Sequence, residues 1–381
     1  MKKIGKEVLF LKTSPTNPRN RESTLLRTKD GRILFAYTEY VGESCLDHAE
    51  ARLSVCESAD EGESWSDPRV LIPKPADAQN IMSPSLIRLR DGAIGMVYLR
   101  KDVCENGGVI CMPLFIRSDD EGKTWSDPRS CGFSTGYYCV INDGVTVTAN
   151  GRIYIPASYT GEVRDVMHVM KEPPRSHVSD VRIAYSNDNG QSWKTCPQVI
   201  SSPFQGRCGL FEPGILEHAD GTLWMYARTT FGHQYQSFSH DGGKSWTTAE
   251  PNCRFTSPDS PMRVKRLGEY VVAIYNPIGY NCLFPKTESW ESPKRTPIAI
   301  TVSSQDGRDL DDPTMNAAHG GFLEIAKNTY LLEDDLNESY CYPSALAVKD
   351  GILVSYYHSN GSGECLHASK IVKIRYDEFD Q

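Results

Sequence analysis

The chain has 381 residues, and a hydrophobic content of 39% with 10% aromatic residues is enough to build a substantial core. Its net charge of −8 and the lack of a basic run argue against nucleic-acid binding. No segment has the apolar length needed to cross a bilayer, so no membrane partner is expected.

Short turns that end in glycine, each followed by an apolar strand, recur along the whole chain. Their glycines are Gly31, Gly92, Gly151, Gly221, Gly268 and Gly351. Asp-Gly or Asn-Gly between two apolar runs is the strongest short-range signal of a β-hairpin. The steps between these glycines are 61, 59, 70, 47 and 83 residues, so six units of about 60 residues fill the chain.

A second motif, S-x-D-x-G-x-[ST]-W, alternates with these turns. It occupies Ser58–Trp65, Ser118–Trp125, Ser186–Trp193 and Ser239–Trp246, and Ser304–Gly307 is a shortened copy without the tryptophan. The aspartate can accept backbone N–H bonds, the glycine can take a positive φ, and the tryptophan can anchor the turn. We interpret this motif as a structural turn and not as a catalytic site.

Repeated units of a few short strands each are typical of the blades of a β-propeller. One blade cannot bury both of its faces, so the six units should close into a ring. The sequence therefore predicts an all-β, six-bladed β-propeller with Asp-box turns, forming a single domain over residues 1–381. The last strand, within Cys365–Tyr376, should pair with the N-terminal strand Glu7–Leu11 to close the ring.

Polar residues stand at one register before the inner strands. The residues nine positions before the turn glycines are Glu22, Ser83, Asn142, Glu212, Asp259 and Tyr342. Polar residues are common where a strand starts, but six at one register favour a shared polar pocket near the propeller axis.

Two arginines lie in apolar strands, where a charge is unusual. Arg228 ends the strand that begins at Leu223, and Arg295 opens the strand that runs to Val302. Each could form a salt bridge with a neighbouring acid. Alternatively, each could offer a guanidinium fork to a ligand carboxylate, which suits arginine better than lysine.

These features resemble the sialidase (neuraminidase) superfamily of six-bladed propellers with Asp-box turns, over essentially the whole chain. The chain is most similar to the bacterial Asp-box, or BNR repeat, proteins described as sialidase-like. Arg21-Glu-Ser-Thr-Leu25 occupies the place of the family's R-I-P-S-L segment, and Tyr342-Pro-Ser-Ala-Leu346 that of Y-S-S-L. Glu212 and Arg228 match the glutamate before the fourth inner strand and the arginine after it. Arg295-Thr-Pro-Ile298 resembles the third arginine's segment.

Two departures from the family pattern concern the substrate. The family's arginine in a segment such as A-x-x-E-x-R is absent after Thr38-Glu39-Tyr40, and Glu22 replaces the isoleucine after the first arginine. A negative charge at Glu22 would lie near the carboxylate-binding arginines, so the preferred sugar could differ from N-acetylneuraminic acid.

The resemblance implies an exo-acting retaining glycoside hydrolase that cleaves a terminal acidic sugar from a glycan. In this reading Tyr342 is the nucleophile, Glu212 accepts its proton, and Asp47 is the acid/base, with Glu50 as the competing carboxylate. The residues expected to bind substrate are Arg21, Arg228, Arg295, Glu22, Asn142 and Asp259. No metal and no organic cofactor is implied.

Other functions fit parts of the same pattern. A carbohydrate-binding propeller without catalysis would keep the arginines but would not need Glu212 beside Tyr342. A lyase acting on uronic acids would also place tyrosine and arginine against a carboxylate. A scaffold with a vestigial pocket would not be expected to keep three arginines, a tyrosine and two acids.

The twelve cysteines bear on the compartment of the protein. The N-terminus has charges but no apolar segment and no small-residue cleavage site, so we read no signal peptide. We therefore expect reduced thiols and a cytoplasmic location. None of the cysteines forms a C-x-x-C pair, which argues against a structural zinc site.

Overall fold

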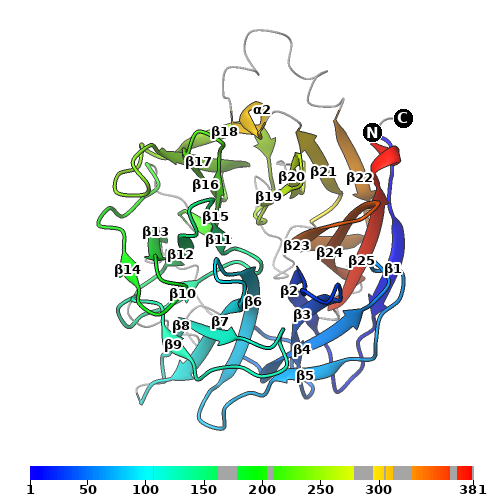
Figure 1. Ribbon diagram of the computed structural model, residues 1–381, viewed down its shortest axis with the longest axis horizontal. Coiled ribbons are helices and arrows are strands. Elements are labelled where there is room, and N and C mark those ends of the chain that lie inside the picture. Colours follow the sequence, from blue (N-terminus) through cyan, green and yellow to red (C-terminus); the bar gives the residue numbers. More distant parts are fainter. Residues whose placement is uncertain are drawn as a thin grey trace, which may run out of the picture.

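The strands form six antiparallel sheets set around a central axis, which confirms the six-bladed propeller (Figure 1). This computed structural model describes residues 1–105, 107–161, 178–203, 209–278, 295–303, 306–311, 328–360 and 367–379. Within each blade the chain runs from the strand nearest the axis to the outermost strand. Neighbouring strands are therefore mostly consecutive in sequence, as the repeated hairpin signals predict; the exceptions are the pairs β10–β12 and β25–β1.

The first three blades each come from one sequence unit. The first contains β2 (Asn20–Arg27), β3 (Ile33–Tyr40), β4 (Ala51–Ser58) and β5 (Arg69–Ile72). The second contains β6 (Asn80–Arg88), β7 (Ile94–Val103), β8 (Val109–Ser118) and β9 (Arg129–Ser130). The third contains β10 (Tyr138–Cys139), β11 (Thr146–Val147), β12 (Ile153–Tyr159), β13 (Asp180–Ser186) and β14 (Lys194–Thr195).

The remaining blades follow the same order, except that the sixth takes its outer strand from the N-terminus. The fourth contains β15 (Phe211–Glu217), β16 (Leu223–Arg228), β17 (His233–Ser239) and β18 (Glu250–Thr256). The fifth contains β19 (Arg263–Leu267), β20 (Tyr270–Tyr275), β21 (Ile298–Ser303) and β22 (Thr329–Glu333). The sixth contains β23 (Glu338–Val348), β24 (Gly351–Asn360), β25 (His367–Arg375) and β1 (Lys6–Leu11).

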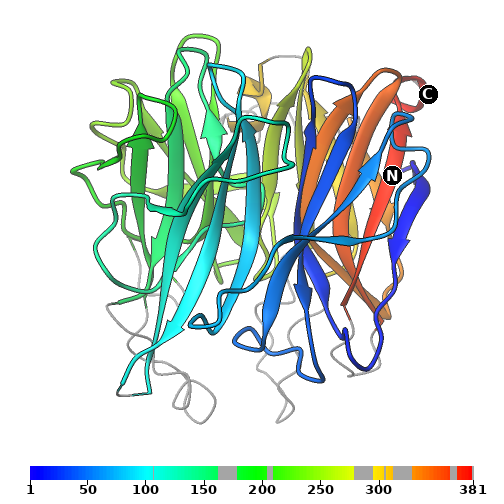
Figure 2. The same cartoon turned by 60° about the horizontal axis from the view of Figure 1, so that its bottom comes forward.

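Strand β1 closes the ring by pairing with β25, as the sequence predicts. Lys6 lies opposite Lys373 and Leu11 lies opposite Ser369 in an antiparallel register. Figure 2 shows the blue N-terminal strand alongside the red C-terminal strand. The predicted start of the last strand, Cys365, lies outside the described residues.

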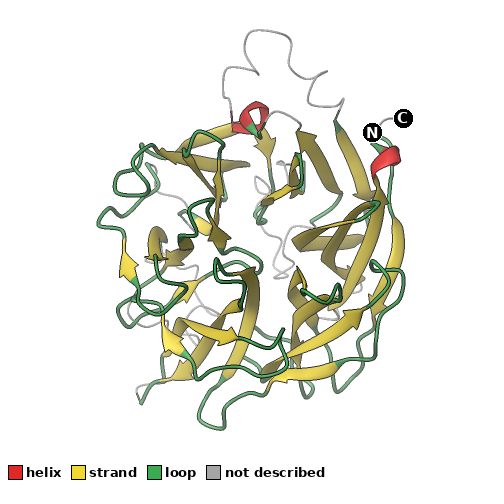
Figure 3. Cartoon of the chain, viewed as in Figure 1, coloured by secondary structure: helices red, strands yellow, loops and turns green. Residues whose placement is uncertain are grey.

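Two short helical segments accompany the strands in the part of the chain that the structure describes, α2 (Arg308–Asp311) and the 3-10 helix Tyr376–Glu378 (Figure 3). No helix in the described ranges has the length and apolar character that a membrane crossing requires. The apolar core lies between adjacent blades. Leu34 and Val55 of the first blade, for example, share a buried cluster with Ile81 and Met96 of the second.

The Asp boxes form the structural turns that their sequence predicts. In the first box the Gly62 N–H donates to Ser58 Oγ at 2.9 Å, and the Ser64 N–H donates to Asp60 Oδ1 at 2.9 Å. Trp65 Nε1 donates to the Gly62 carbonyl at 3.2 Å. Hydrogen bonds from Ser64 lower the pKa of the Asp60 carboxyl to about 2. The aspartate is thus an ionised acceptor that is used within the turn.

The box glycines also contact the preceding blade, which the sequence analysis did not foresee. A Cβ added at Gly190 would lie 2.3 Å from the ring of Phe115 in the second blade. One added at Gly62 would lie 2.7 Å from Leu353 in the sixth blade. Each box is therefore a joint between blades, and its glycine provides space as well as a positive φ.

Where the residue before the box glycine is acidic, as at Glu61, Glu121 and Asp306, it adds a polar contact to this joint. Glu121 accepts two hydrogen bonds from Arg88 at 2.9 Å and one from the backbone N–H of Lys29 in the first blade at 2.9 Å. The shortened copy follows this pattern, because the Asp306 carboxylate accepts from the backbone N–H of Ala219 in the fourth blade at 2.6 Å.

The predicted register of the shortened copy is wrong by one residue. The Gly307 N–H donates to the hydroxyl of Ser303, so Ser303 and not Ser304 takes the first position. Asp306, with a φ of 58°, then corresponds to Glu61, with a φ of 60°, and not to the turn-closing aspartate. Its contact with the fourth blade explains why an acid is present there.

The cysteine expectation is also wrong at one position. Cys45 is disulfide-bonded, whereas the other cysteines that the structure describes are free. Sequence spacing alone does not show which cysteines the loops bring together.

The joint between blades can be tested by comparing Gly190→Ala with Gly221→Ala. Both glycines have similar φ values, +81° and +83°, but nothing lies within 4 Å of a Cβ at Gly221. We expect Gly221→Ala to cost about 1–2 kcal/mol of unfolding free energy from backbone strain alone. Gly190→Ala should cost about 1–3 kcal/mol more, because Phe115 must move. Equal losses in urea unfolding would show that the glycine serves only the turn.

Candidate active site

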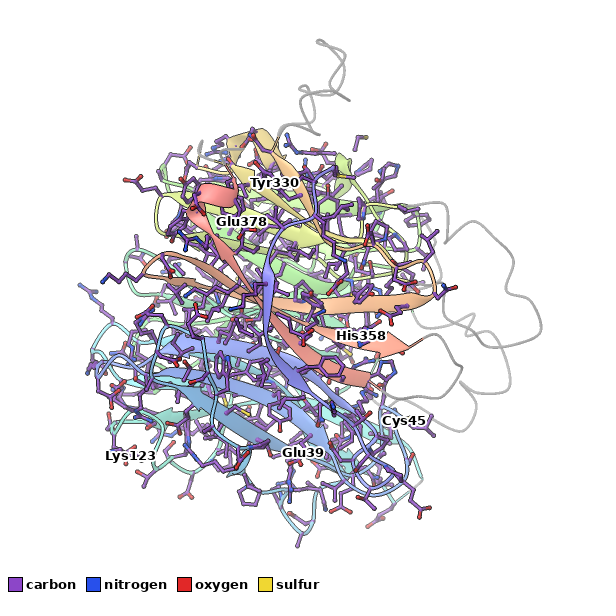
Figure 4. The ribbon with its side chains drawn as sticks, turned by 90° about the vertical axis from the view of Figure 1, so that its right-hand side faces the viewer. Glu39, Cys45, Lys123, Tyr330, His358 and Glu378 are labelled. Carbon is purple, nitrogen blue, oxygen red and sulfur yellow. The ribbon has the colours of Figure 1, made fainter. Side chains whose placement is uncertain are left out.

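The starts of the inner strands and the Asp boxes lie on opposite faces of the propeller. Figure 4 shows this from the side, with Cys45 of the loop between β3 and β4 at one edge and Lys123 of an Asp box at the other. The predicted site residues belong to the face that carries Cys45. They lie at the starts of inner strands, in the loops beside them and, for Arg228, at the end of β16.

Left-handed residues mark the starts of five inner strands. They are Glu22, Ser83, Asp143, Glu212 and Tyr342, with φ values between 46° and 55°. Four of them coincide with a shift in the pairing of the inner strand with its neighbour. Non-glycine residues in this conformation cost about 1–3 kcal/mol each and cluster at functional sites. The register count predicts four of these five positions. In the third blade the left-handed residue is Asp143, one position after the predicted Asn142. In the fifth blade the predicted Asp259 lies in the loop before β19 and does not have a positive φ.

A continuous chain of hydrogen bonds links Tyr342 to Glu212, Arg228 and Asp259. Its hydroxyl donates to Glu212 Oε1 at 2.6 Å, and Arg228 Nη1 donates to Glu212 Oε2 at 2.6 Å. Arg228 Nε in turn donates to Asp259 Oδ1 at 2.6 Å. The structure therefore brings together four of the predicted residues, from the fourth, fifth and sixth blades.

The other two predicted arginines lie against the same tyrosine. The Arg21 guanidinium is 4.7 Å from the centre of the Tyr342 ring, and that of Arg295 is 5.6 Å away. Arg295 donates to the backbone carbonyl of Asp259 at 2.9 Å and 3.2 Å. Among the described residues, Arg21 Nη1 and Nη2, Arg228 Nη2 and Arg295 Nη1 donate no hydrogen bond. These N–H groups can therefore bind an oxyanion.

Electrostatics keeps the tyrosine protonated at rest. Burial and the Glu212 carboxylate raise the pKa of Tyr342 well above its usual value, and the three arginines only partly oppose this. Tyr342 is 8% exposed, and its hydroxyl donates a hydrogen bond to Glu212. This is the geometry of a nucleophile with its base, because both atoms are within hydrogen-bond reach.

Arg19 is a central residue that the sequence analysis missed. Its Nη2 donates to Glu22 Oε1 at 2.7 Å and its Nη1 donates to Asp47 Oδ1 at 2.7 Å. It is 2% exposed, and its guanidinium lies 4.3 Å from the centre of the Tyr40 ring. Alternation in a strand was an available signal, since Arg19 and Arg21 are two residues apart.

Glu22, which its register predicts to bind substrate, is paired with two arginines of the protein. It is 2% exposed and accepts hydrogen bonds from both Arg19 and Arg21. Burial raises the pKa of Glu22, but the two arginines outweigh it and lower the pKa below its usual value. Its negative charge is therefore compensated within the protein.

Asn142, another residue predicted to bind substrate, is bonded to the backbone of neighbouring blades. It has no exposed surface, and its side-chain N–H group donates to the carbonyls of Ser23 at 2.6 Å and Tyr342 at 3.2 Å. Asn276, which the sequence analysis did not select, donates in the same way to the carbonyls of Arg295 and Tyr340. These two amides position the backbone of Tyr342 and Arg295.

Asp47 differs from the other predicted acids because its side chain is 63% exposed. The carbonyl of Asp47 accepts from Asn80 Nδ2 at 3.0 Å and Lys101 Nζ at 2.6 Å, so the second blade holds its backbone. Glu50 is also exposed, and it lies 3.9 Å from Lys74. Of these two carboxylates, only Asp47 is linked by Arg19 to the residues around Tyr342.

The profile of the BNR repeat-like domain family matches residues 76–355, which is more than half of the chain. The chain belongs to this BNR repeat-like family. The match begins after the first blade and ends within the sixth. It therefore includes Glu212, Arg228 and Tyr342 but not the segment with Arg19, Arg21 and Asp47.

Solved structures resemble this BNR repeat-like protein over nearly its full length. A protein of unknown function from Dyadobacter fermentans is 19% identical, with a TM-score of 0.70, over 97% of this chain and 99% of that one. The K499G mutant of NanB sialidase from Streptococcus pneumoniae is 12% identical, with a TM-score of 0.67, over 98% and 71%.

A Trypanosoma rangeli sialidase, in complex with 2,3-difluorosialic acid as a covalent intermediate, is 14% identical, with a TM-score of 0.66, over 96% and 58%. At these identities the likeness shows a shared fold. A sequence search of curated proteins finds no match.

The buried pair of Arg19 and Glu22 can be tested by a double-mutant cycle. Both side chains are at most 3% exposed, so Arg19→Leu or Glu22→Ile alone removes one charge from a buried, balanced group. Arg21 still pairs with Glu22 in the first variant and Asp47 with Arg19 in the second, so each should cost up to about 3–5 kcal/mol. The double variant should be less destabilised than the sum of the two single variants. Urea unfolding measures all four proteins, and additive losses would show that the two charges are not coupled.

Proposed function

We propose that this protein is an exo-acting retaining glycoside hydrolase that releases a terminal acidic sugar through a tyrosine nucleophile. The observation that carries the proposal is the 2.6 Å hydrogen bond from Tyr342 to Glu212, with three arginines around the same phenol. The Trypanosoma rangeli sialidase, which shares the fold, was captured as a covalent intermediate with a sialic acid derivative. This supports the reaction type.

The arginines define the kind of sugar. The unpaired N–H groups of Arg21, Arg228 and Arg295 suit a carboxylate, which arginine binds through paired hydrogen bonds. When the anomeric carbon carries that carboxylate, a carboxylate nucleophile would approach against a like charge. A neutral phenol avoids this repulsion, which is the reason for a tyrosine in place of the usual second acid.

The reaction proceeds in two steps. In the first, Glu212 accepts the proton of the Tyr342 hydroxyl as its oxygen forms a bond to the anomeric carbon and the leaving group departs with the electron pair. In the second, water attacks the same carbon, its proton passes to a base, and Tyr342 recovers its proton from Glu212. Two inversions give net retention. The residues that act need neither a metal nor an organic cofactor.

Arg228 orients the base in this scheme. Its Nη1 binds Glu212 Oε2 and its Nε binds Asp259, so the glutamate keeps the oxygen Oε1 toward Tyr342. Such preorganisation contributes to catalysis because the reacting atoms start within bonding reach.

The nucleophile is tested by Tyr342→Phe, with Tyr357→Phe as the matched control. The Tyr357 ring lies 6.0 Å from that of Tyr342, but its hydroxyl contacts Ser339 and not Glu212. We expect Tyr342→Phe to lower turnover by about 1000-fold or more while sugar binding persists, because the attacking oxygen is lost. Tyr357→Phe should stay within about threefold of wild type.

The assay uses 4-nitrophenyl glycosides of N-acetylneuraminic acid, other nonulosonic acids and uronic acids, with binding followed by calorimetry. Turnover by Tyr342→Phe near the wild-type rate would rule out the tyrosine as nucleophile. Binding of an acidic sugar without turnover by the wild type would identify a carbohydrate-binding propeller. An unsaturated product absorbing in the ultraviolet would identify a lyase.

A further inference from the structure

The contacts of Asp47 place a limit on the chemistry of the first step. Asp47 is the carboxylate at the exposed edge of the site, where a leaving group would pass into solvent. Its Oδ1 accepts from Arg19 Nη1 at 2.7 Å. A general acid must carry a proton before it can donate one, and an ion pair with arginine favours the form without the proton.

Arg19 is fixed and cannot be displaced by a substrate. It is 2% exposed and donates to Glu22 Oε1 and to the Cys45 carbonyl, as well as to Asp47. The backbone of Asp47 is fixed too, because Asn80 and Lys101 both donate to its carbonyl. Rotation of the Asp47 side chain would break the hydrogen bond but would keep the two charges close together.

The other charged groups around Asp47 act in the same direction. Desolvation raises the pKa of Asp47, but Arg19, Arg21 and Lys101 outweigh it and hold the pKa well below its usual range. The negative charge of Glu22 is already shared by Arg19 and Arg21.

Two uncharged groups complete these surroundings. Burial raises the pKa of Tyr40, so its phenol is neutral. Burial together with Arg21 and Arg19 lowers the pKa of His367 well below its usual value, so its ring is neutral as well. Neither supplies a negative charge that would help Asp47 to hold a proton.

We propose, on the basis of the function proposed above, that Asp47 acts only as the base that activates water in the second step. The first step then runs without proton donation, and the substrates are aryl glycosides of an acidic sugar. Their phenolic oxygen leaves as a stabilised anion, whereas an alkoxide would have to be protonated. The proton of the attacking water passes to Asp47 and then to solvent, which balances the reaction.

The test compares four compounds of one acidic sugar: its 4-nitrophenyl, phenyl and methyl glycosides and its glycosyl phosphate. We expect kcat/KM to fall steeply from nitrophenyl to phenyl. The kcat/KM of the methyl glycoside should be about 10²–10⁴-fold lower than that of the phenyl glycoside, because no acid protonates the departing methoxide. If the phosphate is the best substrate of the series, an anionic aglycone and not an aryl group is recognised, and the aryl assignment is overturned.

Asp47→Asn separates the two steps, since kcat/KM reports the first step and kcat the second when the glycosyl-enzyme accumulates. We expect a burst of nitrophenol, a kcat lower by about 10²–10⁴-fold, and the wild-type dependence of kcat/KM on the leaving group. Glu50→Gln, which removes the other exposed carboxylate of this loop, should behave as wild type. A larger loss of kcat/KM for phenyl than for nitrophenyl in Asp47→Asn would show that Asp47 is an acid after all.

The double variant Arg19→Leu, Glu22→Ile tests whether Asp47 can become a proton donor when Arg19 is removed. Without Arg19, Asp47 can hold a proton, so hydrolysis of the methyl glycoside should rise relative to the nitrophenyl glycoside. The acid limb of kcat should move to higher pH. No relative gain in a folded double variant contradicts the role of Arg19. In contrast, phenol release that does not depend on Tyr342, or no release by the wild type, overturns the proposed function itself and this inference with it.

Discussion

The left-handed backbone at the starts of the inner strands is the constraint on which the site depends. A regular strand would alternate its side chains between the two faces of a blade. A one-residue shift in pairing at Glu22, Ser83, Glu212 and Tyr342 interrupts that alternation beside the propeller axis. Each such residue is strained, and contacts with neighbouring blades hold the strained segments in place. Asn142, for example, joins the carbonyls of Ser23 and Tyr342, which come from the first and sixth blades.

Charge compensation explains how so many ionised groups, most of them buried, can lie close together. The site contains four arginines and four carboxylates, so their formal charges cancel: Arg19, Arg21, Arg228 and Arg295 against Glu22, Asp47, Glu212 and Asp259. Unpaired charges at this depth would each cost several kcal/mol. In the proposed reaction, a bound carboxylate would make the site negative overall. Positive charge developing on the anomeric carbon would then be stabilised in the transition state more than in the ground state.

The repeated turns and the register of polar residues were enough to predict most of the fold and of the central site from the sequence. Six glycine turns predicted six blades, and all of these glycines except Gly351 have a positive φ. The same register located Tyr342 and Glu212, which the structure joins by a hydrogen bond. Side-chain partners were harder to predict. The register places Glu22 at the pocket but does not show that Arg19 pairs with it. That pairing depends on a bulge in β2, which the sequence pattern does not reveal.

The same limit applies between blades. The glycine of an Asp box needs a positive φ in the turn, and this alone accounts for its presence in the motif. The contact of Gly190 with Phe115 arises from two different sequence units. The two residues come into contact only when the blades pack side by side in the ring, so no local sequence pattern predicts this contact.

The closure of the sixth blade by β1 has a consequence for biosynthesis. The outer strand of this blade is made first and its other three strands are made last, since Lys6 pairs with Lys373. During translation the N-terminal strand must therefore wait with an unpaired edge until nearly the whole chain has emerged. Contacts this distant in sequence slow folding, and exposed strand edges promote aggregation. The ring is thus most exposed to chaperone capture or misassembly just before its last strand is synthesised.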